Sequence, residues 1–280
     1  MKQFKQIIQE GVYDPGIFKA FFLAGGPGSG KSYVTNRSTG GMGLKLVNSD
    51  TRFERYLTKA GLSLKMPDKE AALRDPLRAK AKKVTGDQMD LYIQGRLGLV
   101  IDATGRDYSI ISRQKSLLSM LGYDCYMIFV NTSLEVALER NRTRTRRVPE
   151  DITRKSWQTV QNNIGKFQTT FGRSNFIVVD NNNANEDILN KLWTRVRGLV
   201  RAPVRSIVAK RWMQIQIDTK KQIALAKLTR DAIKQLDKDI KDRKRMGINP
   251  YSLNPFLYQL KQQDPKAFMQ IIKQRGLNVK

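Results

Sequence analysis

An eight-residue glycine-rich segment, GGPGSGKS, constrains the fold of this 280-residue chain more than any other feature. It fulfils the pattern G-x-x-x-x-G-K-[ST] through Gly25, Gly30, Lys31 and Ser32. An apolar run, FKAFFLA, comes directly before it, and a helix-compatible segment, KSYVTNRS, overlaps its end. The alternative is a glycine-rich turn that fits the pattern by chance, but such a turn does not require this order of flanking elements. The pattern therefore predicts a strand, a phosphate-binding loop and a helix.

The residues of this loop suit phosphate groups. Glycine permits a backbone path in which successive N–H groups point at phosphate oxygens, and the following helix adds the positive end of its dipole. We expect Lys31 to contact the β- and γ-phosphates as a catalytic residue, and the hydroxyl of Ser32 to bind Mg²⁺. The expected ligands are therefore a nucleoside triphosphate, ATP or GTP, and Mg²⁺. The residues assigned to the nucleotide are Gly25, Gly26, Gly28, Ser29, Gly30, Lys31 and Ser32.

Five apolar runs predict the fold around this loop. They read FKAFFLAG, LKLVNSD, LGLVIDATG, YDCYMIFVNT and NFIVVDN, and helix-length segments separate them. Near-continuous apolar runs of this length are typical of parallel strands buried on both faces. We therefore predict an α/β fold of the P-loop NTPase type, with three layers and a parallel sheet of about five strands.

Positive charge is unevenly distributed along the chain. The sequence holds 51 Lys and Arg against 25 Asp and Glu, for a net charge of +26, and residues 201–280 contain 19 basic and 6 acidic residues. Strand-like runs end before that segment and helical patterns rich in Lys and Arg replace them. We predict an N-terminal helix over 1–16, a P-loop domain over 17–200 and a basic α-helical extension over 201–280. Within the extension we expect a long helix at 204–245 and short helices at 255–262 and 265–274.

Composition excludes several classes of chemistry. The chain has no histidine and one cysteine, Cys125, which falls in an apolar run. Zinc clusters, Ser-His-Asp hydrolysis and intrachain disulfides are therefore excluded, and proton transfer falls to carboxylates, lysine or water. No segment approaches the roughly 18 apolar residues that a membrane span needs, so we expect a cytoplasmic protein without a membrane partner. A charge of this size attracts polyanions.

Two aspartates follow predicted strands, at the sheet edge where open parallel sheets bind ligands. Asp50 follows LKLVNS, where it can bind an acceptor hydroxyl and take its proton as the γ-phosphoryl group moves. Asp102 ends LGLVI, where an acidic side chain holds Mg²⁺ directly or through water. Each has a structural alternative, because Asp50 suits the N-cap of the helix TRFERYL and Asp102 suits a capping or turn position. Thr104 and Arg106 follow Asp102 closely enough to face the same cleft.

Arginines are concentrated in ALERNRTRTRRVPED, a segment between two predicted helices. So many like charges need an anion, and in phosphoryl-transfer enzymes a mobile arginine-rich lid closes over the triphosphate. The alternative is a solvated basic face, which must hold for some of these residues because they cannot all reach one phosphate chain. The arginines are Arg140, Arg142, Arg144, Arg146 and Arg147.

Taken in order, GGPGSGKS, NSDTRF, VIDATGR, ERN and VPE resemble the zeta-toxin and polynucleotide-kinase branch of P-loop kinases, over about residues 17–199. The resemblance implies a kinase-like fold and assigns the catalytic base to Asp50. An arginine shortly after that base in bacteriophage polynucleotide kinases is approximately matched by Arg52, which is thereby a substrate-binding candidate. The family's lid arginines correspond to Arg140 and Arg147, which are thereby catalytic candidates.

Zeta toxins also carry a Glu-x-Thr-x-Arg pattern after the third strand. Asp102, Thr104 and Arg106 keep its spacing with Asp in place of Glu, so the resemblance implies that these three contact the acceptor. The substitution of Asp for Glu and the basic extension are departures from the zeta-toxin pattern.

These features predict an ATP-dependent kinase that transfers the γ-phosphoryl group to a hydroxyl of a nucleic-acid 5′ end, a nucleotide or a UDP-sugar. The alternative is a nucleic-acid-binding or assembly protein in which nucleotide binding is regulatory or vestigial. Aromatic residues among the basic side chains of the extension can stack on bases or pack inward, and the sequence leaves both open. They are Trp212, Tyr251, Phe256 and Tyr258.

Overall fold

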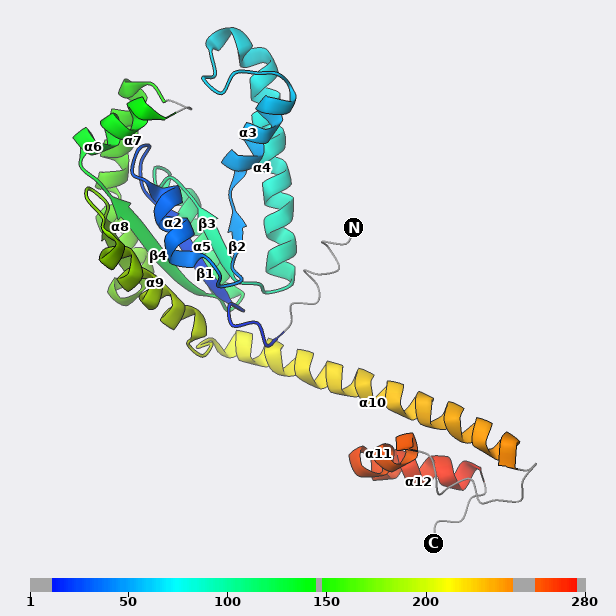
Figure 1. Cartoon of the computed structure of the whole chain (residues 1–280). Helices are drawn as coiled ribbons and strands as arrows, with labels where there is room; N and C mark the ends of the chain where they lie inside the picture. The colour runs from blue at the N-terminus through cyan, green and yellow to red at the C-terminus, as the bar shows by residue number, and fades with distance from the viewer. Residues whose placement is uncertain (1–11, 145–147, 244–254, 276–280) are drawn as a thin grey trace. The chain divides into compact units, whose positions relative to one another are not determined.

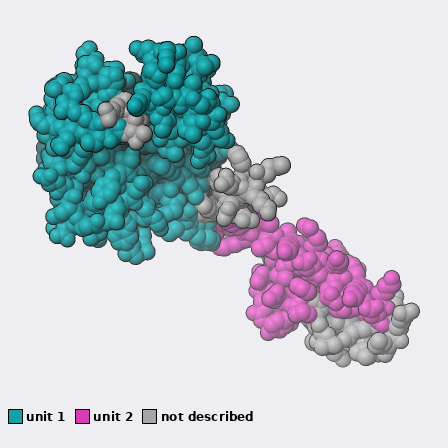
Figure 2. All heavy atoms as spheres, turned by 45° about the horizontal axis from the view of Figure 1, so that its top comes forward, with its two compact units in different colours: residues 1–210 teal, residues 211–280 magenta. Residues whose placement is uncertain are grey.

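The computed structural model describes residues 12–144, 148–243 and 255–275. The chain divides into two compact units, Met1–Lys210 and Arg211–Lys280 (Figure 2). The division falls after Lys210, so the segment 201–210 belongs to the first unit. Arg205 there lies 3.2 Å from the buried carboxylate of Asp124, and a Cβ on Gly122 would lie 2.9 Å from Ala209.

The first unit is built around one parallel sheet of five strands in the order β2-β3-β1-β4-β5 (Figure 1). The sheet confirms the predicted α/β fold. The central strand, β1, is buried along its whole length, as its unbroken apolar sequence requires. The strands are β1 (Lys19–Ala24), β2 (Lys45–Val47), β3 (Leu99–Asp102), β4 (Asp124–Asn131) and β5 (Phe176–Asp180).

Helices connect the strands and cover both faces of the sheet. The helices of the first unit are α2 (Lys31–Thr39), α3 (Ser49–Lys59), α4 (Ala71–Gln94), α5 (Tyr108–Met120), α6 (Leu134–Thr143), α7 (Glu150–Asn162), α8 (Ile164–Phe171) and α9 (Glu186–Arg201). Short 3₁₀ turns lie at Asp68–Glu70 and Arg173–Asn175. The part of the predicted N-terminal helix that is described, residues 12–16, forms turns, and residues 1–11 lie outside the described ranges.

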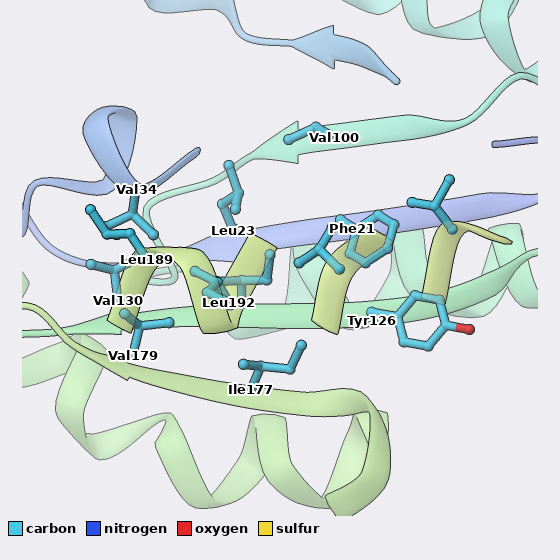
Figure 3. Packing of buried hydrophobic residues seen from close by; sticks show 13 residues of the cluster. Phe21, Leu23, Val34, Val100, Tyr126, Val130, Ile177, Val179, Leu189 and Leu192 are labelled. Atoms are coloured by element: carbon cyan, nitrogen blue, oxygen red, sulfur yellow. The ribbon is translucent and has the colours of Figure 1, made fainter. Parts of the chain in front are cut away.

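Alternation along β1 sends side chains to two cores. Phe21 and Leu23 point to the face that α2 and α9 cover, where they pack with Val34 of α2 and Leu189 and Leu192 of α9 (Figure 3). On the opposite face the ring of Phe22 meets that of Phe171 of α8 in an edge contact at 5.3 Å. Because both faces are covered, the polar ligand site is left to the carboxyl edge of the sheet.

Helices α3 and α4 pack together beside the sheet. Phe53 and Leu57 of α3 and Ala81 of α4 are buried in a small apolar cluster of their own. The guanidinium of Arg78 on α4 lies over the ring of Phe53, 4.9 Å from its centroid. The cluster fixes α4 against the beginning of α3, directly after the end of β2.

The second unit consists of helices. They are α10 (Ile207–Arg243), which begins in the first unit, α11 (Pro255–Gln263) and α12 (Pro265–Gln274), close to the three helices predicted. Residues from all three form one apolar cluster that includes Leu236, Leu260 and Phe268. In the described ranges, none of the helices is both long and apolar enough to cross a membrane.

Candidate nucleotide and phosphoryl-transfer site

The loop after β1 has a backbone path that only glycine follows easily. Gly28 and Gly30 have φ angles of +79° and +75°. A Cβ on Gly28 would lie 2.0 Å from the carbonyl oxygen of Ala137, and one on Gly30 would lie 2.3 Å from the side-chain amide of Asn181. The loop therefore needs glycine at both positions for conformation and for space, although the phosphate-binding pattern fixes only Gly30 of the two.

Hydrogen bonds from neighbouring elements fix the backbone of this loop. The N–H of Gly25 donates to the carbonyl oxygen of Thr104 at 3.1 Å, and Nδ2 of Asn181 donates to the carbonyl oxygen of Ser29 at 2.7 Å. On α7, the indole Nε1 of Trp157 donates to the carbonyl oxygen of Thr132 at 2.8 Å. The two bonds to the loop come from the segments after β3 and β5, so the carboxyl edge of the sheet fixes the loop.

Polar groups around the loop are left for a ligand. Helix α2 begins after Gly30, which gives it no side-chain cap, and its first turn contains no acidic residue. The Ser29 hydroxyl and Nη1 of Arg140 are buried without a hydrogen-bond partner among the described residues. Nη1 of Arg140 lies 3.5 Å from the position a Cβ on Gly30 would take. Uncapped N–H groups and an unpaired cationic nitrogen beside the loop fit an anionic ligand such as a phosphate chain.

Lys31 and Asp102 form an ion pair at the mouth of the loop. Nζ of Lys31 lies 2.7 Å from Oδ1 of Asp102, and the two side chains are 15% and 10% exposed. Oδ2 of Asp102 accepts a hydrogen bond of 2.6 Å from Nδ2 of Asn48. The pair joins the loop to the ends of β2 and β3, so the carboxylate of Asp102 faces the phosphate-binding side.

The donor atoms at this point suit Mg²⁺. Oδ1 of Asp102 contacts only the Lys31 ammonium among the described polar groups, and accepts no hydrogen bond from them. Ser32, in the first turn of α2, offers an exposed hydroxyl. Hard oxygen ligands of this kind, with phosphate and water oxygens completing the shell, are what Mg²⁺ takes in nucleotide sites. In the described ranges, no group of three or more His, Cys, Asp or Glu side chains is arranged to hold a metal ion.

Asp50 lies in the first turn of α3 and does not cap it. The N-cap is Asn48, whose Oδ1 accepts a hydrogen bond of 2.6 Å from the backbone N–H of Asp50. The capping alternative for Asp50 was therefore wrong, because the asparagine two residues earlier satisfies the end of the helix. Nη1 of Arg78 donates to Oδ1 of Asp50 at 2.5 Å, across the contact between α3 and α4. The carboxylate is half-exposed and stands at the site edge in a fixed orientation.

A cavity of about 230 Å³ opens between the beginning of α3 and α4. On its wall, Nη2 of Arg52 donates to Oε1 of Gln88 at 2.7 Å, while Nε of Arg52 is buried without a partner among the described residues. Gln88 in turn donates to the hydroxyl of Tyr92. Arg55 is exposed and adds a second guanidinium to the same wall. The lining residues are Leu46, Asn48, Thr51, Arg52, Arg55 and Gln88.

Thr104 and Arg106 lie on the turn that follows β3. The hydroxyl of Thr104 accepts from the backbone N–H of Arg106 at 3.4 Å, and both side chains are exposed. Nδ2 of Asn163 donates to the carbonyl oxygens of Gly105 and Arg106, each at 3.1 Å. The turn therefore leads directly from Asp102 to the base of the glycine loop, where the sequence pattern placed it.

The arginine-rich segment begins at the end of α6 and is pinned at its base. Nδ2 of Asn141 donates to the carbonyl oxygen of Val148 at 2.6 Å, and the N–H of Val148 donates back to Oδ1 of Asn141 at 3.1 Å. Nη2 of Arg140 donates to the carbonyl oxygen of Asn182 at 2.9 Å, which holds its guanidinium beside the loop. Arg140 therefore lies beside the glycine loop, whereas Arg147, with residues 145 and 146, lies outside the described ranges.

Arg142 has a different environment from Arg140. Its Nε donates to Oε1 of Glu150 at 2.6 Å. This hydrogen bond holds the pKa of the Glu150 carboxyl below its usual value and raises the pKa of the Arg142 guanidinium. Both side chains are well exposed, so this arginine belongs to the solvated part of the segment in the structure described.

Comparison with protein families bears directly on this arrangement. A family model described as AAA domain (AAA_33) matches residues 21–166, which is more than half of the chain. The chain belongs to this AAA domain family. The AAA domain match runs from β1 to the beginning of α8 and so includes the glycine loop, both aspartates and Arg140. Comparison with curated proteins gives no match.

Solved structures similar to this AAA domain protein include enzymes described as kinases. A gluconokinase from Sinorhizobium meliloti 1021 is 18% identical, with 66% of this chain and 94% of that chain covered and a TM-score of 0.41. Shikimate kinase from Bacteroides thetaiotaomicron is 12% identical, with 66% and 99% covered and a TM-score of 0.43. The AvrRxo1-ORF1:ORF2 complex with ATP is 14% identical, with 74% and 72% covered and a TM-score of 0.44.

Several residues of the AAA domain site were missed by sequence reasoning. Arg78 and Gln88 contact Asp50 and Arg52 from α4, and their spacing from those partners carries no recognisable pattern. Asn181, which holds the loop through Ser29, follows β5 and was detectable as a polar residue at a strand end. Asp50 and Asp102 were singled out because polar residues at the carboxyl ends of parallel strands are site candidates. The same rule applies to the end of β5.

Proposed function

We propose that this protein is an ATP- and Mg²⁺-dependent phosphotransferase that moves the γ-phosphoryl group to an acceptor hydroxyl. The observation that supports it most is the convergence of a glycine-built loop, the Lys31–Asp102 ion pair and the Asp50 carboxylate at one sheet edge. Binding of a nucleotide and Mg²⁺ alone would need only the first two of these. The aspartate after β2 gives the site a group that can accept the proton of an attacking hydroxyl.

The proposed step uses residues in separate roles. The acceptor oxygen attacks the γ-phosphorus, the bond from that phosphorus to the β–γ bridging oxygen breaks, and ADP leaves. Asp50 takes the proton of the acceptor hydroxyl, while Lys31 and Arg140 bind phosphate oxygens whose charge grows in the transition state. Mg²⁺, held by Ser32 and Asp102, would supply charge neutralisation at the phosphate oxygens. Thr104 and Arg106 remain proposed acceptor contacts, and Arg147 a proposed catalytic contact.

The acceptor side of the site favours a molecule that carries its own negative charge. The cavity at the beginning of α3 presents Arg52 and Arg55 and is lined by no carboxylate. We infer an acceptor that already holds a phosphate, which agrees with the resemblance to zeta toxins and polynucleotide kinases. A nucleic-acid 5′ end, a nucleotide and a UDP-sugar all meet this requirement.

An acceptor screen tests the proposal. Purified protein is incubated with γ-labelled ATP, Mg²⁺ and a panel of 5′-hydroxyl oligonucleotides, nucleotides and UDP-N-acetylglucosamine, with the Lys31→Ala variant as the blank. A labelled product that forms with the wild type and not with the variant supports the phosphotransferase. Tight ATP binding without a labelled product from any acceptor would count against it.

The second candidate function is that of a nucleic-acid-binding or assembly protein in which nucleotide binding is regulatory. It is favoured by the charge of residues 201–280, which hold 19 basic and 6 acidic residues, more than a docking helix needs. The same screen separates the two functions. Nucleic-acid binding that changes with ATP, without transfer, identifies the second one.

A further inference from the structure

Six basic residues of α10 lie along one side of that helix and are here called the basic stripe. At about 100° per residue their side chains fall within an arc of roughly 80°, and over 21 residues they extend for about 32 Å. All six are exposed. The residues are Lys220, Lys227, Arg230, Lys234, Lys238 and Lys241, and all belong to the second unit.

The apolar side of α10 points the opposite way. Ala232 and Leu236 are fully buried, and Leu225, Leu228 and Ile240 pack beside them against residues of α11 and α12. The positions of these residues on the helix lie about half a turn away from the basic stripe. Over residues 225–240 the helix is therefore amphipathic, and its apolar side there is covered inside the second unit.

The charges of the basic stripe are not neutralised within the described part of the chain. None of its six residues forms an ion pair with a described carboxylate. Asp237 is engaged by Arg275 at 2.7 Å, and Asp231 and Asp242 lie beside the arc rather than within it. Water and salt screen the repulsion in such an exposed row only in part, and an extended anion along it would replace the counterions that the row attracts.

We propose that the basic stripe binds the phosphodiester backbone of nucleic acid. The row is long and straight, as a polyphosphate chain requires, and Lys and Arg are the side chains that displace its counterions. A basic amphipathic helix on a lipid surface would need its apolar side free, but that side packs against Leu260 and Phe268. The inference concerns α10 and does not depend on the phosphotransferase activity.

The test compares two triple variants of the full-length protein. Lys227→Gln/Lys234→Gln/Lys241→Gln removes half of the basic stripe, and Lys221→Gln/Lys266→Gln/Lys273→Gln removes three exposed lysines that lie elsewhere in the second unit. Both lose the same net charge. Affinity for a 20-base-pair DNA duplex and for an RNA strand is measured by fluorescence anisotropy over a range of salt concentrations. Circular dichroism confirms that each variant keeps its helix content.

The proposal predicts a difference between the two variants. For duplex DNA, three lost phosphate contacts reduce the slope of log K against log salt by about 2.7, and Kd at 0.1 M salt rises on the order of 10²-fold. In the control variant, both the salt-dependence slope and Kd should change far less. The proposal would be overturned if the two variants lost equal affinity for nucleic acid. It would also be overturned if the wild-type protein bound phosphatidylserine vesicles but neither the DNA duplex nor the RNA strand.

Discussion

The ammonium of Lys31 lies 2.7 Å from Oδ1 of Asp102, so the cation of the glycine loop is paired with the carboxylate that follows β3. The pair holds Lys31 at the site where we expect the triphosphate to bind. It also compensates two largely buried charges. A bound triphosphate offers Lys31 stronger partners than this carboxylate, and Mg²⁺ offers Asp102 one. The ion pair thus marks the place where nucleotide and metal enter.

Replacement of this lysine should strongly weaken nucleotide binding. In Lys31→Ala the triphosphate loses a charge-assisted contact, and Asp102 keeps a largely buried charge without its partner. We expect the Kd for Mg·ATP to rise by about 100-fold, as measured by isothermal titration calorimetry. Lys59→Ala, at the end of α3, serves as the control and should bind normally. Equal affinities for the two variants would show that the loop does not hold the triphosphate.

Gly28 offers a test of the loop geometry with a matched control elsewhere in the chain. Gly28 and Gly43 have φ angles of +79° and +74°, but a Cβ on Gly43 would meet nothing within 4 Å. Gly43→Ala should therefore cost only the conformational penalty, about 1–2 kcal/mol. Gly28→Ala adds a clash with Ala137 and should lower the melting temperature further and remove ATP binding. Similar melting temperatures with ATP binding intact would contradict the loop geometry described.

Arg78 should influence transfer through the orientation of Asp50. Arg78→Gln removes the 2.5 Å contact to Oδ1 and leaves the carboxylate less well oriented toward an acceptor. We expect kcat to fall by roughly 10- to 100-fold with ATP affinity unchanged, and Arg78→Lys to recover part of the loss. A fall in ATP affinity in place of kcat would place Arg78 in nucleotide binding.

Cys125 should be unreactive in the folded protein. Burial raises the pKa of its thiol to about 11, so at pH 8 very little thiolate is present and reagents have little access to it. Reaction with a chromogenic disulfide reagent should be slow in the native state and fast in guanidinium chloride. Above pH 10 the native rate should rise only slightly, because access is still blocked. Rapid native labelling at pH 8 would show that β4 opens readily.

Much of the fold could be predicted because its signals are local. The strand before Gly25, the glycines themselves and the apolar runs of β3 and β4 each determine their own structure with little help from elsewhere. Asp50 and Asp102 were found because they follow strands of a parallel sheet, and all such ends meet at one edge. The order of the segments along the chain and the types of their residues were sufficient to predict the strands, the glycine loop and the positions of the two aspartates.

The rest of the site depends on contacts between distant segments. Arg78 meets Asp50 across 28 residues, and Gln88 meets Arg52 across 36, on a helix whose surface is rich in charge throughout. The sequence suggested Asp50 as a cap for α3, but the helix begins two residues earlier than expected and Asn48 caps it. The contacts of Arg78 and Gln88 form only when α3 packs on α4, so the sequence of one segment alone does not predict them.

The account is tested most directly by transfer in the Asp50→Asn variant. The amide keeps the size of the side chain but cannot take a proton, and Asn48 still caps α3, so folding and ATP affinity should stay near normal. In single-turnover experiments with γ-labelled ATP and an acceptor found by the screen, we predict that the transfer rate falls by roughly 10²–10⁴-fold. A transfer rate equal to that of the wild type would contradict the assignment of Asp50 as the base.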